Sequence, residues 1–224
     1  DGGGHPEIPL LMRSFLAEML FNEGKHGEAA QLLEEVLEGQ LSTHGDIHEH
    51  TLHTRMTLAL AHKHADSDDP MQVAAMFREV LEGQITLFGP MHKNTLHTRT
   101  LLASHLHDHG ENDEAEAHYN AAVDGFVTTL GETHEQTLIP KGSLANLLVN
   151  TGRVQEAEEM YREVLEGYVI LYGTEHKCTY ETQFNLACLL DRNQSDEESM
   201  AEAEALFRQV VEGYEMTLGA ERRD

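Results

Sequence analysis

The sequence is poor in cysteine and in basic residues, and it has no long hydrophobic run. It carries 40 acidic residues against 15 lysines and arginines, for a formal net charge of −25 at pH 7. Such a surface repels nucleic-acid phosphates and anionic lipid headgroups. Apolar runs such as "LANLLV" are far shorter than the ~18 residues that a membrane span requires. We therefore expect no nucleic-acid partner and no direct membrane insertion.

The two cysteines, Cys178 and Cys188, lie ten positions apart in one expected helix. At the rise of an α-helix their Cα atoms would be roughly 15 Å apart, which is too far for a disulfide. This favours a reducing intracellular compartment, with the cytoplasm first and an organelle interior as the alternative. No signal or transit segment is visible. Because the chain begins at Asp1 without a methionine, we expect a processed form or a fragment of a longer chain.

What the sequence does contain is an internal repeat of five units. A glycine recurs at intervals of 42 to 46 residues, and a second glycine follows each one six residues later. Four of the second glycines are followed by a histidine three residues on and by a threonine six residues on. The first glycines are Gly39, Gly83, Gly125, Gly167 and Gly213, and the second are Gly45, Gly89, Gly131, Gly173 and Gly219. The histidines are His48, His92, His134 and His176, and the threonines are Thr51, Thr95, Thr137 and Thr179. The units span approximately residues 5–44, 45–88, 89–130, 131–172 and 173–219.

Each unit has the pattern of two helices joined by a polar turn. In the fourth unit, apolar side chains recur at helical spacing from Ala157 to Leu171, and Gly173 then ends the helix as a left-handed cap. The first glycine of each pair lies inside this second helix, where glycine costs about 1 kcal/mol relative to alanine. We expect the first helix of the next unit to approach closely at these glycines, with a slight helix bend as the alternative.

Two segments, "GPMHKNTLHTRTLLA" (residues 89–103) and "EAEEMYREVLEG" (residues 156–167), carry a family resemblance. They resemble tetratricopeptide repeats of the 42-residue type seen in kinesin light chains and their bacterial relatives. The family's small packing residues match Ala17, Ala59, Ala103, Ala145 and Ala187 in the first helices, and Ala29, Ala115, Ala157 and Ala203 in the second, with Val73 as the exception. The resemblance implies an all-α fold, a right-handed α-α superhelical solenoid of about five hairpins. It implies a single array over residues 1–224, with the first helices on its concave face.

The chain departs from the family pattern in its asparagines. Family members often hold the backbone of an extended peptide with tandem asparagines of the first helix. Here only Asn146 and Asn185 stand near those positions. We keep these two residues as candidates for contact with a partner.

One basic position recurs in the first helices. It holds Arg13, Arg55, Arg99 and Lys141 in units one to four, and Gln183 in unit five. One interpretation is ion pairing with a glutamate of a neighbouring helix, which stabilises by only ~0.2–1 kcal/mol when the pair is exposed. The other is a row of cations that receives acidic side chains of a bound peptide. Around this row the groove-facing candidates are His53, Met56, Lys63, His97, Thr100, Ser104 and His107.

Histidine is abundant, and eleven of the sixteen lie between His44 and His109, so protonation below about pH 6.5 would make this region basic. His105 and His109 share a helix face, but no cysteine pair or HExxH motif completes a zinc site. We expect no metal and no other cofactor, and a metal- or pH-responsive sensor is the third functional hypothesis. The repeated turn histidines match the family pattern and are expected to be structural.

Signals of catalysis are absent: there is no phosphate-binding glycine loop, nucleophile elbow or cysteine–histidine arrangement. The sequence therefore predicts a non-enzymatic scaffold that binds a partner protein or peptide through its concave groove. The alternative is a permanent structural subunit of a larger multiprotein complex.

Overall fold

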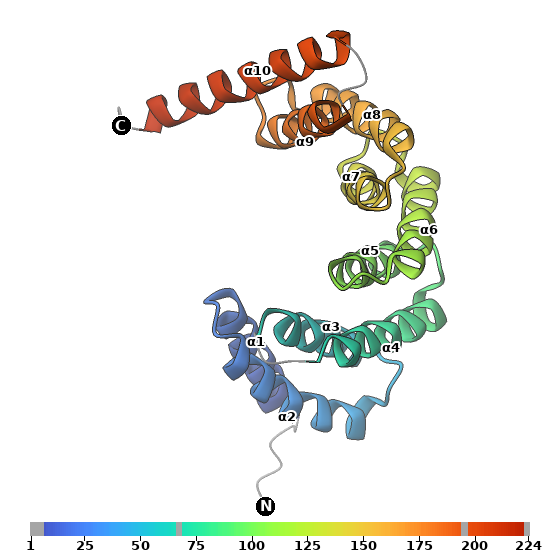
Figure 1. Cartoon of the computed structure of the whole chain (residues 1–224). Helices are drawn as coiled ribbons and strands as arrows, with labels where there is room; N and C mark the ends of the chain where they lie inside the picture. The colour runs from blue at the N-terminus through green and yellow to red at the C-terminus, as the bar shows by residue number, and fades with distance from the viewer. Residues whose placement is uncertain (1–6, 66–68, 194–196, 222–224) are drawn as a thin grey trace, which may run out of the picture. The chain divides into compact units, whose positions relative to one another are not determined.

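The structure is a computed structural model that describes residues 7–65, 69–193 and 197–221, with backbone only for residues 7, 8 and 216–221. These residues form ten α-helices and no β-strand (Figure 1). In chain order the helices are α1 (Glu7–Asn22), α2 (His26–His44), α3 (Glu49–His64), α4 (Pro70–Phe88), α5 (Lys93–Asp108), α6 (Asn112–Leu130), α7 (Glu135–Asn150), α8 (Val154–Tyr172), α9 (Lys177–Asn193) and α10 (Glu197–Glu221). The predicted all-α fold is confirmed.

In chain order the ten helices form five successive pairs, called hairpins below, each with a first helix and a longer second helix. One end differs from the expectation, because α10 runs through Gly219 to Glu221 instead of ending at that glycine. The four glycines that do end second helices are each followed, three residues on, by a histidine that caps the next helix. In the sequence, Arg222 stands at that place after Gly219.

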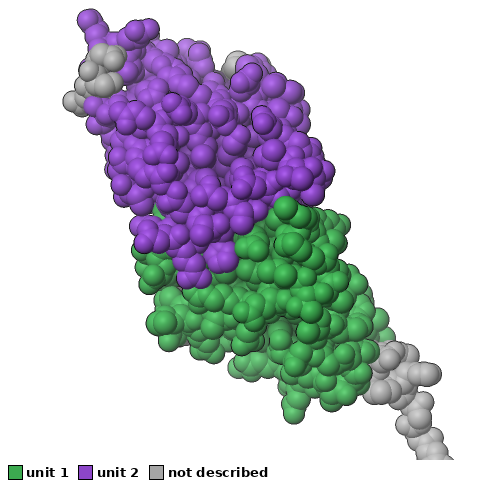
Figure 2. All heavy atoms as spheres, turned by 90° about the vertical axis from the view of Figure 1, so that its right-hand side faces the viewer, with its two compact units in different colours: residues 1–111 green, residues 112–224 purple. Residues whose placement is uncertain are grey.

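The chain divides into two compact units, residues 1–111 and residues 112–224, coloured green and purple in Figure 2. The first unit holds α1 to α5 and the second holds α6 to α10. Within each unit, every helix packs on the next one along the chain. The interior of each unit is therefore built from alternating contacts within a hairpin and between consecutive hairpins.

The turn between hairpins has the same construction four times. The glycine that ends the second helix has φ between 81° and 92°, a left-handed conformation that favours glycine. The histidine caps the following helix, because its Nδ1 accepts a hydrogen bond from the backbone N–H two residues on. The threonine is fully buried, and its hydroxyl donates to the carbonyl of the glycine at 2.8–2.9 Å. The turn histidines are thus structural, as predicted.

The glycines inside the second helices are points of close approach, but by a different helix from the one expected. A Cβ atom added at Gly83 would lie 2.4 Å from Leu52 Cδ2, and one at Gly167 would lie 2.6 Å from Leu138 Cδ2. Both leucines belong to the first helix of the same hairpin, and the prediction of an approach by the next hairpin was wrong. The leucine follows the buried turn threonine directly, so the turn itself places it against the glycine.

The core is built from small residues where helices cross and from larger residues between hairpins. The first-helix alanines and most second-helix alanines are fully buried. A representative cluster joins Ala17 and Ala30 of the first hairpin to Leu58 and Ala61 of the second. On α9, Cys178 and Cys188 are free thiols, as their spacing predicted.

Candidate functional site

In three hairpins, the side chain at the recurring basic position contacts the second helix of its own hairpin. Arg13 Nη1 donates to Glu35 Oε2 at 2.9 Å, and Lys141 Nζ lies 2.6 Å from Glu163 Oε2. In the fifth hairpin, the equivalent Gln183 donates through Nε2 to the side-chain oxygen of a glutamine on α10 at 3.1 Å. Two of the five positions thus form an ion pair with the second helix and a third forms a neutral hydrogen bond there, which favours pairing within the hairpin over a free row of cations.

Arg55 makes a different contact, because its guanidinium donates to Asp46 Oδ1 at 2.7 Å in the turn before α3. Arg99 is half-buried, and this burial lowers the pKa of its guanidinium. A partner would have to compete with the Asp46 carboxylate for Arg55.

The first helices of the first unit are also joined directly by charged side chains. His53 Nε2 on α3 lies 3.1 Å from Glu18 Oε1 on α1. On the other side of α3, Lys63 Nζ lies 3.3 Å from Asp108 Oδ2 on α5. Two of the predicted groove residues therefore lie on the surface where consecutive first helices meet.

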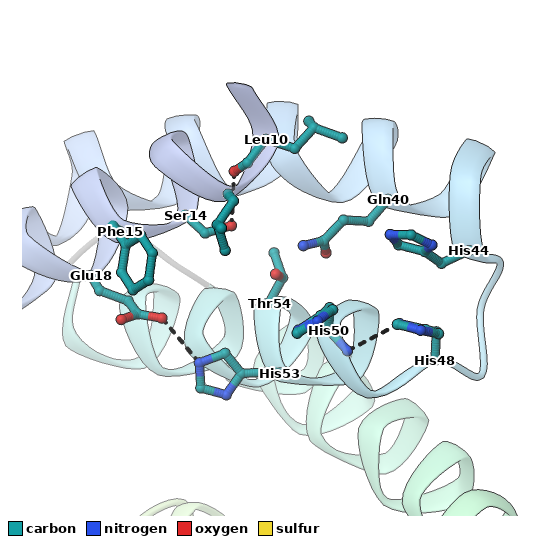
Figure 3. A pocket seen from close by; sticks show the side chains of 11 residues that line it. Leu10, Ser14, Phe15, Glu18, Gln40, His44, His48, His50, His53 and Thr54 are labelled. Atoms are coloured by element: carbon teal, nitrogen blue, oxygen red, sulfur yellow. Dashed lines mark hydrogen bonds and ion pairs between the residues drawn. The ribbon is translucent and has the colours of Figure 1, made fainter. Parts of the chain in front are cut away.

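His53 also lines a pocket of about 530 Å³ between α1, the end of α2 and the start of α3 (Figure 3). Three more histidines line it, and His44 stacks on His48 with ring centroids 4.4 Å apart. Leu10 and Phe15 add apolar surface from α1. The pocket therefore offers titratable rings, the Glu18 carboxylate and an apolar wall.

An unsatisfied hydrogen-bond acceptor lies in the same pocket. Gln40 is 7% exposed, and its Oε1 atom is buried without a hydrogen-bond partner among the described residues. In the second hairpin the equivalent Gln84 accepts a hydrogen bond from Thr98 at 2.7 Å. A buried acceptor without a donor is costly, so Gln40 lacks the stabilising bond that Gln84 has.

The remaining candidates of the first unit are spread over the surface and the interior. His97 is exposed, whereas Met56, Ser104 and His107 are half-buried. Thr100 is buried, and its hydroxyl donates to the Leu96 carbonyl at 3.1 Å. Its side chain therefore offers little to a partner.

In the second unit, the structure brings Asn146 of α7 and Asn185 of α9 into one pocket of about 330 Å³. Tyr161 of α8 forms part of its wall, and its hydroxyl donates to Asn146 Oδ1. Burial raises the pKa of Tyr161 to about 12, so the phenol stays protonated at neutral pH. Arg192 lines the same pocket and supplies a positive charge.

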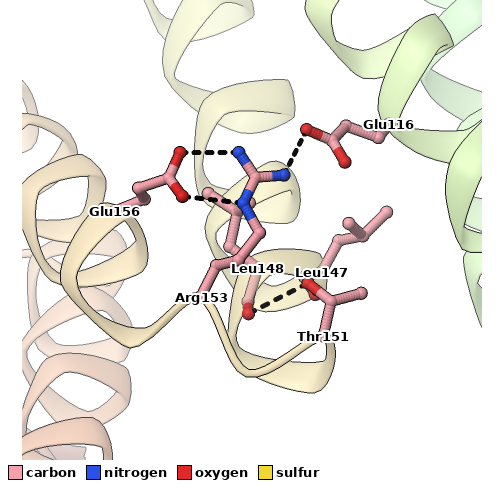
Figure 4. A network of polar contacts seen from close by, with 6 residues as sticks. All are labelled: Glu116, Leu147, Leu148, Thr151, Arg153 and Glu156. Atoms are coloured by element: carbon pink, nitrogen blue, oxygen red, sulfur yellow. Dashed lines mark hydrogen bonds and ion pairs between the residues drawn. The ribbon is translucent and has the colours of Figure 1, made fainter.

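Sequence reasoning missed the arginines that join consecutive second helices. Arg153, at the start of α8, holds Glu156 with two nitrogens and reaches Glu116 of α6 with a third (Figure 4). These contacts raise the pKa of Arg153 and lower that of Glu156. About two and a half turns further along α8, Arg162 bridges Glu158 to Glu202 of α10. The acidic second helices are thus partly a pairing surface, which the spacing of arginine and glutamate across repeats could have indicated.

Among the described residues, no three histidine, cysteine, aspartate or glutamate side chains are arranged to hold a metal ion. In that same part of the chain, no helix is both long and apolar enough to cross a membrane.

Comparison with family models decides the family. Residues 10–50 and residues 94–168 match two models, each described as tetratricopeptide repeat. The chain belongs to the tetratricopeptide-repeat family. The expected resemblance is therefore confirmed, and it extends to the kinesin-light-chain type, as solved structures show.

A kinesin light chain with nearly identical TPR-like repeats from Podosopora anserina superposes on the array with a TM-score of 0.78 at 25% identity, covering 95% of this chain and 98% of that chain. BtubC (BKLC) from P. vanneervenii gives a TM-score of 0.79 at 18% identity, covering 92% and 80%. The apo form of the quorum sensor NprR from B. thuringiensis gives 0.74 at 16% identity, covering 93% and 54%. The last two show likeness of fold alone. A comparison with curated proteins returns no match.

Tetratricopeptide arrays are scaffolds for protein–protein interaction, and the fold is that of a non-catalytic repeat family.

Proposed function

We propose that the chain is a non-enzymatic scaffold that binds an extended peptide of a partner protein on the surface of its first helices. The observation that carries the proposal is the pocket shared by Asn146 and Asn185. A side-chain amide can donate to a peptide carbonyl and accept from a peptide N–H, which suits it to an extended backbone. The resemblance supports this, because family members often hold peptides with first-helix asparagines.

The charges nearby indicate the side chains that such a peptide would carry. Arg192 of α9 lines the pocket that Asn146 and Asn185 share. In a chain of net charge −25, positive charge on the first helices favours a peptide with acidic residues. In the pocket beside α1, the Glu18 carboxylate instead favours a basic residue. We place this function in a reducing intracellular compartment, which the two free thiols support.

The proposal is tested by selecting binders from a displayed random-peptide library on the immobilised chain and measuring their affinity by fluorescence anisotropy. The variant Asn146→Ala/Asn185→Ala is expected to weaken binding roughly tenfold or more, because the peptide backbone loses two partners. The matched control is Asn120→Ala, an exposed asparagine on the second helix α6, which should leave affinity unchanged.

Because Asn146 also accepts the Tyr161 hydroxyl, Asn185→Ala is measured alone as well. If peptides are selected but both asparagine variants bind them as well as the unmodified chain, the binding surface lies elsewhere. If no peptide is selected, the peptide-binding proposal is wrong.

A second candidate is a permanent structural subunit of a larger assembly. The observation in its favour is apolar surface on α1, where Met12, Phe15 and Met19 are each more than half exposed. Large exposed apolar patches mark interaction surfaces. An assembly subunit would co-purify with its partners at a constant ratio, whereas a peptide-binding adaptor would retain them at varying ratios.

A further inference from the structure

Helix α1 has exposed apolar side chains at positions that are buried in every later hairpin. Leu16, just before the first-helix alanine, is 49% exposed, and Met19, two residues after that alanine, is 59% exposed. The residues at these two positions in later hairpins are at most 4% exposed. They are Leu58, Leu102, Leu144 and Leu186 at the first position, and Ala61, His105, Leu147 and Leu189 at the second.

In the later hairpins, this face is covered by the second helix of the preceding hairpin. Leu33 of α2 lies in one apolar cluster with Leu58 and Ala61 of α3, and Leu37 packs against the same cluster. Leu33 and Leu37 stand four and eight residues after the second-helix alanine, Ala29. A surface that covers α1 in the same way must present apolar residues at these two spacings.

Helix α10 presents such a surface, and none of the described helices packs over it. Phe207 and Val211 stand four and eight residues after the second-helix alanine, Ala203. They line a pocket of about 470 Å³ together with Met200, and Val211 is 56% exposed. The chain therefore holds both halves of the interface that it builds between its own hairpins.

Charges on the two faces complement one another in the same register. Between the fourth and fifth hairpins, Arg162 pairs with Glu158 of its own helix and with Glu202, the residue before the next second-helix alanine. Arg208 of α10 stands at the position of Arg162 and already pairs with Glu204, as Arg162 does with Glu158. The residue before the second-helix alanine of the first hairpin is also a glutamate, Glu28, and it is exposed.

We propose that the chain associates head to tail with a second copy of itself. The α10 face of one copy packs on the α1 face of the next, with Phe207 and Val211 against Leu16 and Met19. Arg208 of one copy then pairs with Glu28 of the other. Such a contact joins two different surfaces. An oligomer of any length therefore has an unpaired α1 face at one end and an unpaired α10 face at the other, so association continues as the concentration rises.

The test is sedimentation velocity on the 224-residue chain over a range of concentrations at about 0.15 M salt, where charge repulsion is screened beyond ~8 Å. The unmodified chain is expected to form a concentration-dependent series of oligomers. Met19→Glu and Val211→Glu each place a carboxylate on one face, and each variant alone is expected to be a monomer at the same concentrations. Both positions are exposed, and circular dichroism and thermal melting confirm that each variant is folded.

Mixing the two variants distinguishes this contact from other modes of association. Each keeps the face that the other has lost, so an equimolar mixture is expected to form a dimer and nothing larger. An unmodified chain that stays monomeric throughout, or a mixture that stays monomeric, would overturn the proposal. Association that survives in either single variant would overturn it too.

The register is tested by exchanging charges. Arg208→Glu places two acidic groups opposite one another and is expected to weaken association at least fivefold. Adding Glu28→Arg in the same chain restores an opposite-charge pair at every contact and should recover most of the affinity. If the double exchange does not recover affinity, the assigned pairing of Arg208 with Glu28 is wrong, and so is the proposed alignment of α10 on the first hairpin of the next copy.

Discussion

Leu138 Cδ2 lies 2.6 Å from the position that a Cβ atom on Gly167 would occupy, and Leu138 is 1% exposed. The leucine has no open space into which to retreat. Gly167→Ala is therefore expected to lower the free energy of unfolding by about 1 kcal/mol, because overpacking outweighs the gain in helix propensity. Urea denaturation followed by circular dichroism measures the change.

The matched control is Gly142→Ala, a substitution in the middle of α7. The nearest atom to its added Cβ would be Val164 Cγ1 at 3.8 Å, an ordinary contact distance. This variant should gain up to ~1 kcal/mol from helix propensity. If both alanine variants stabilise the chain, close packing is not the reason for glycine inside the second helices.

A second prediction concerns the turn between the third and fourth hairpins. The Thr137 hydroxyl donates to the Gly131 carbonyl at 2.8 Å, and Thr137 is fully buried. Thr137→Val keeps the shape of the side chain and leaves the carbonyl without its partner, which should cost about 1–2 kcal/mol. Thr128→Val removes a similar bond on an exposed helix face and should change stability by less than about 0.5 kcal/mol. Equal effects in thermal denaturation would mean that the turn bond has no special role.

A third prediction concerns acid stability. His105 is 3% exposed and donates through Nε2 to the Pro70 carbonyl. Burial lowers its pKa, with His109 and Lys63 acting in the same direction, while the Pro70 carbonyl and Asp108 oppose the shift. The folded chain thus resists protonation that the unfolded chain accepts below about pH 6.5, so stability falls as the pH falls through that value.

His105→Gln removes this titration and keeps a donor for the carbonyl. The stability of the unmodified chain relative to the variant is expected to fall by about 1 kcal/mol between pH 7.5 and pH 5. His50→Gln, at an exposed histidine, serves as the control for the removal of a ring. A difference that is constant over this range would contradict the assignment of a neutral, buried His105.

A fourth prediction concerns the basic row of the first unit. Arg55→Ala/Arg99→Ala is expected to weaken a selected acidic peptide about five- to tenfold, measured by fluorescence anisotropy in increasing salt. The comparison is Arg13→Ala, whose guanidinium is paired with Glu35 on the second helix. An unchanged affinity would assign Arg55 and Arg99 to internal pairing alone.

Much of the fold could be predicted from the sequence because each local sequence pattern occurs several times in the repeat. The four turns carry the same glycine, histidine and threonine, and each of these residues makes the same bond every time. The direction of approach at Gly167 could not be derived in this way. Periodicity says that a second helix needs a close neighbour, and only the packing shows that Leu138 of the same hairpin supplies it.

The candidate site was less accessible to sequence reasoning, because exposure depends on packing. The asparagine positions placed Asn146 and Asn185 correctly on consecutive first helices, and the structure adds the pocket that they share. Thr100 has a groove-facing position in the repeat but is buried. Gln40 gave no signal at all, since an unpartnered buried oxygen is visible only once its neighbours are in place.

The most direct test of the scaffold function is affinity purification from the native source, comparing the unmodified chain with Asn146→Ala/Asn185→Ala by quantitative mass spectrometry. The account predicts partners that are retained at varying, substoichiometric ratios, that share a short acidic motif, and that are lost from the double variant but kept by Asn120→Ala. A retained set that is identical for the unmodified chain and the double variant would contradict it.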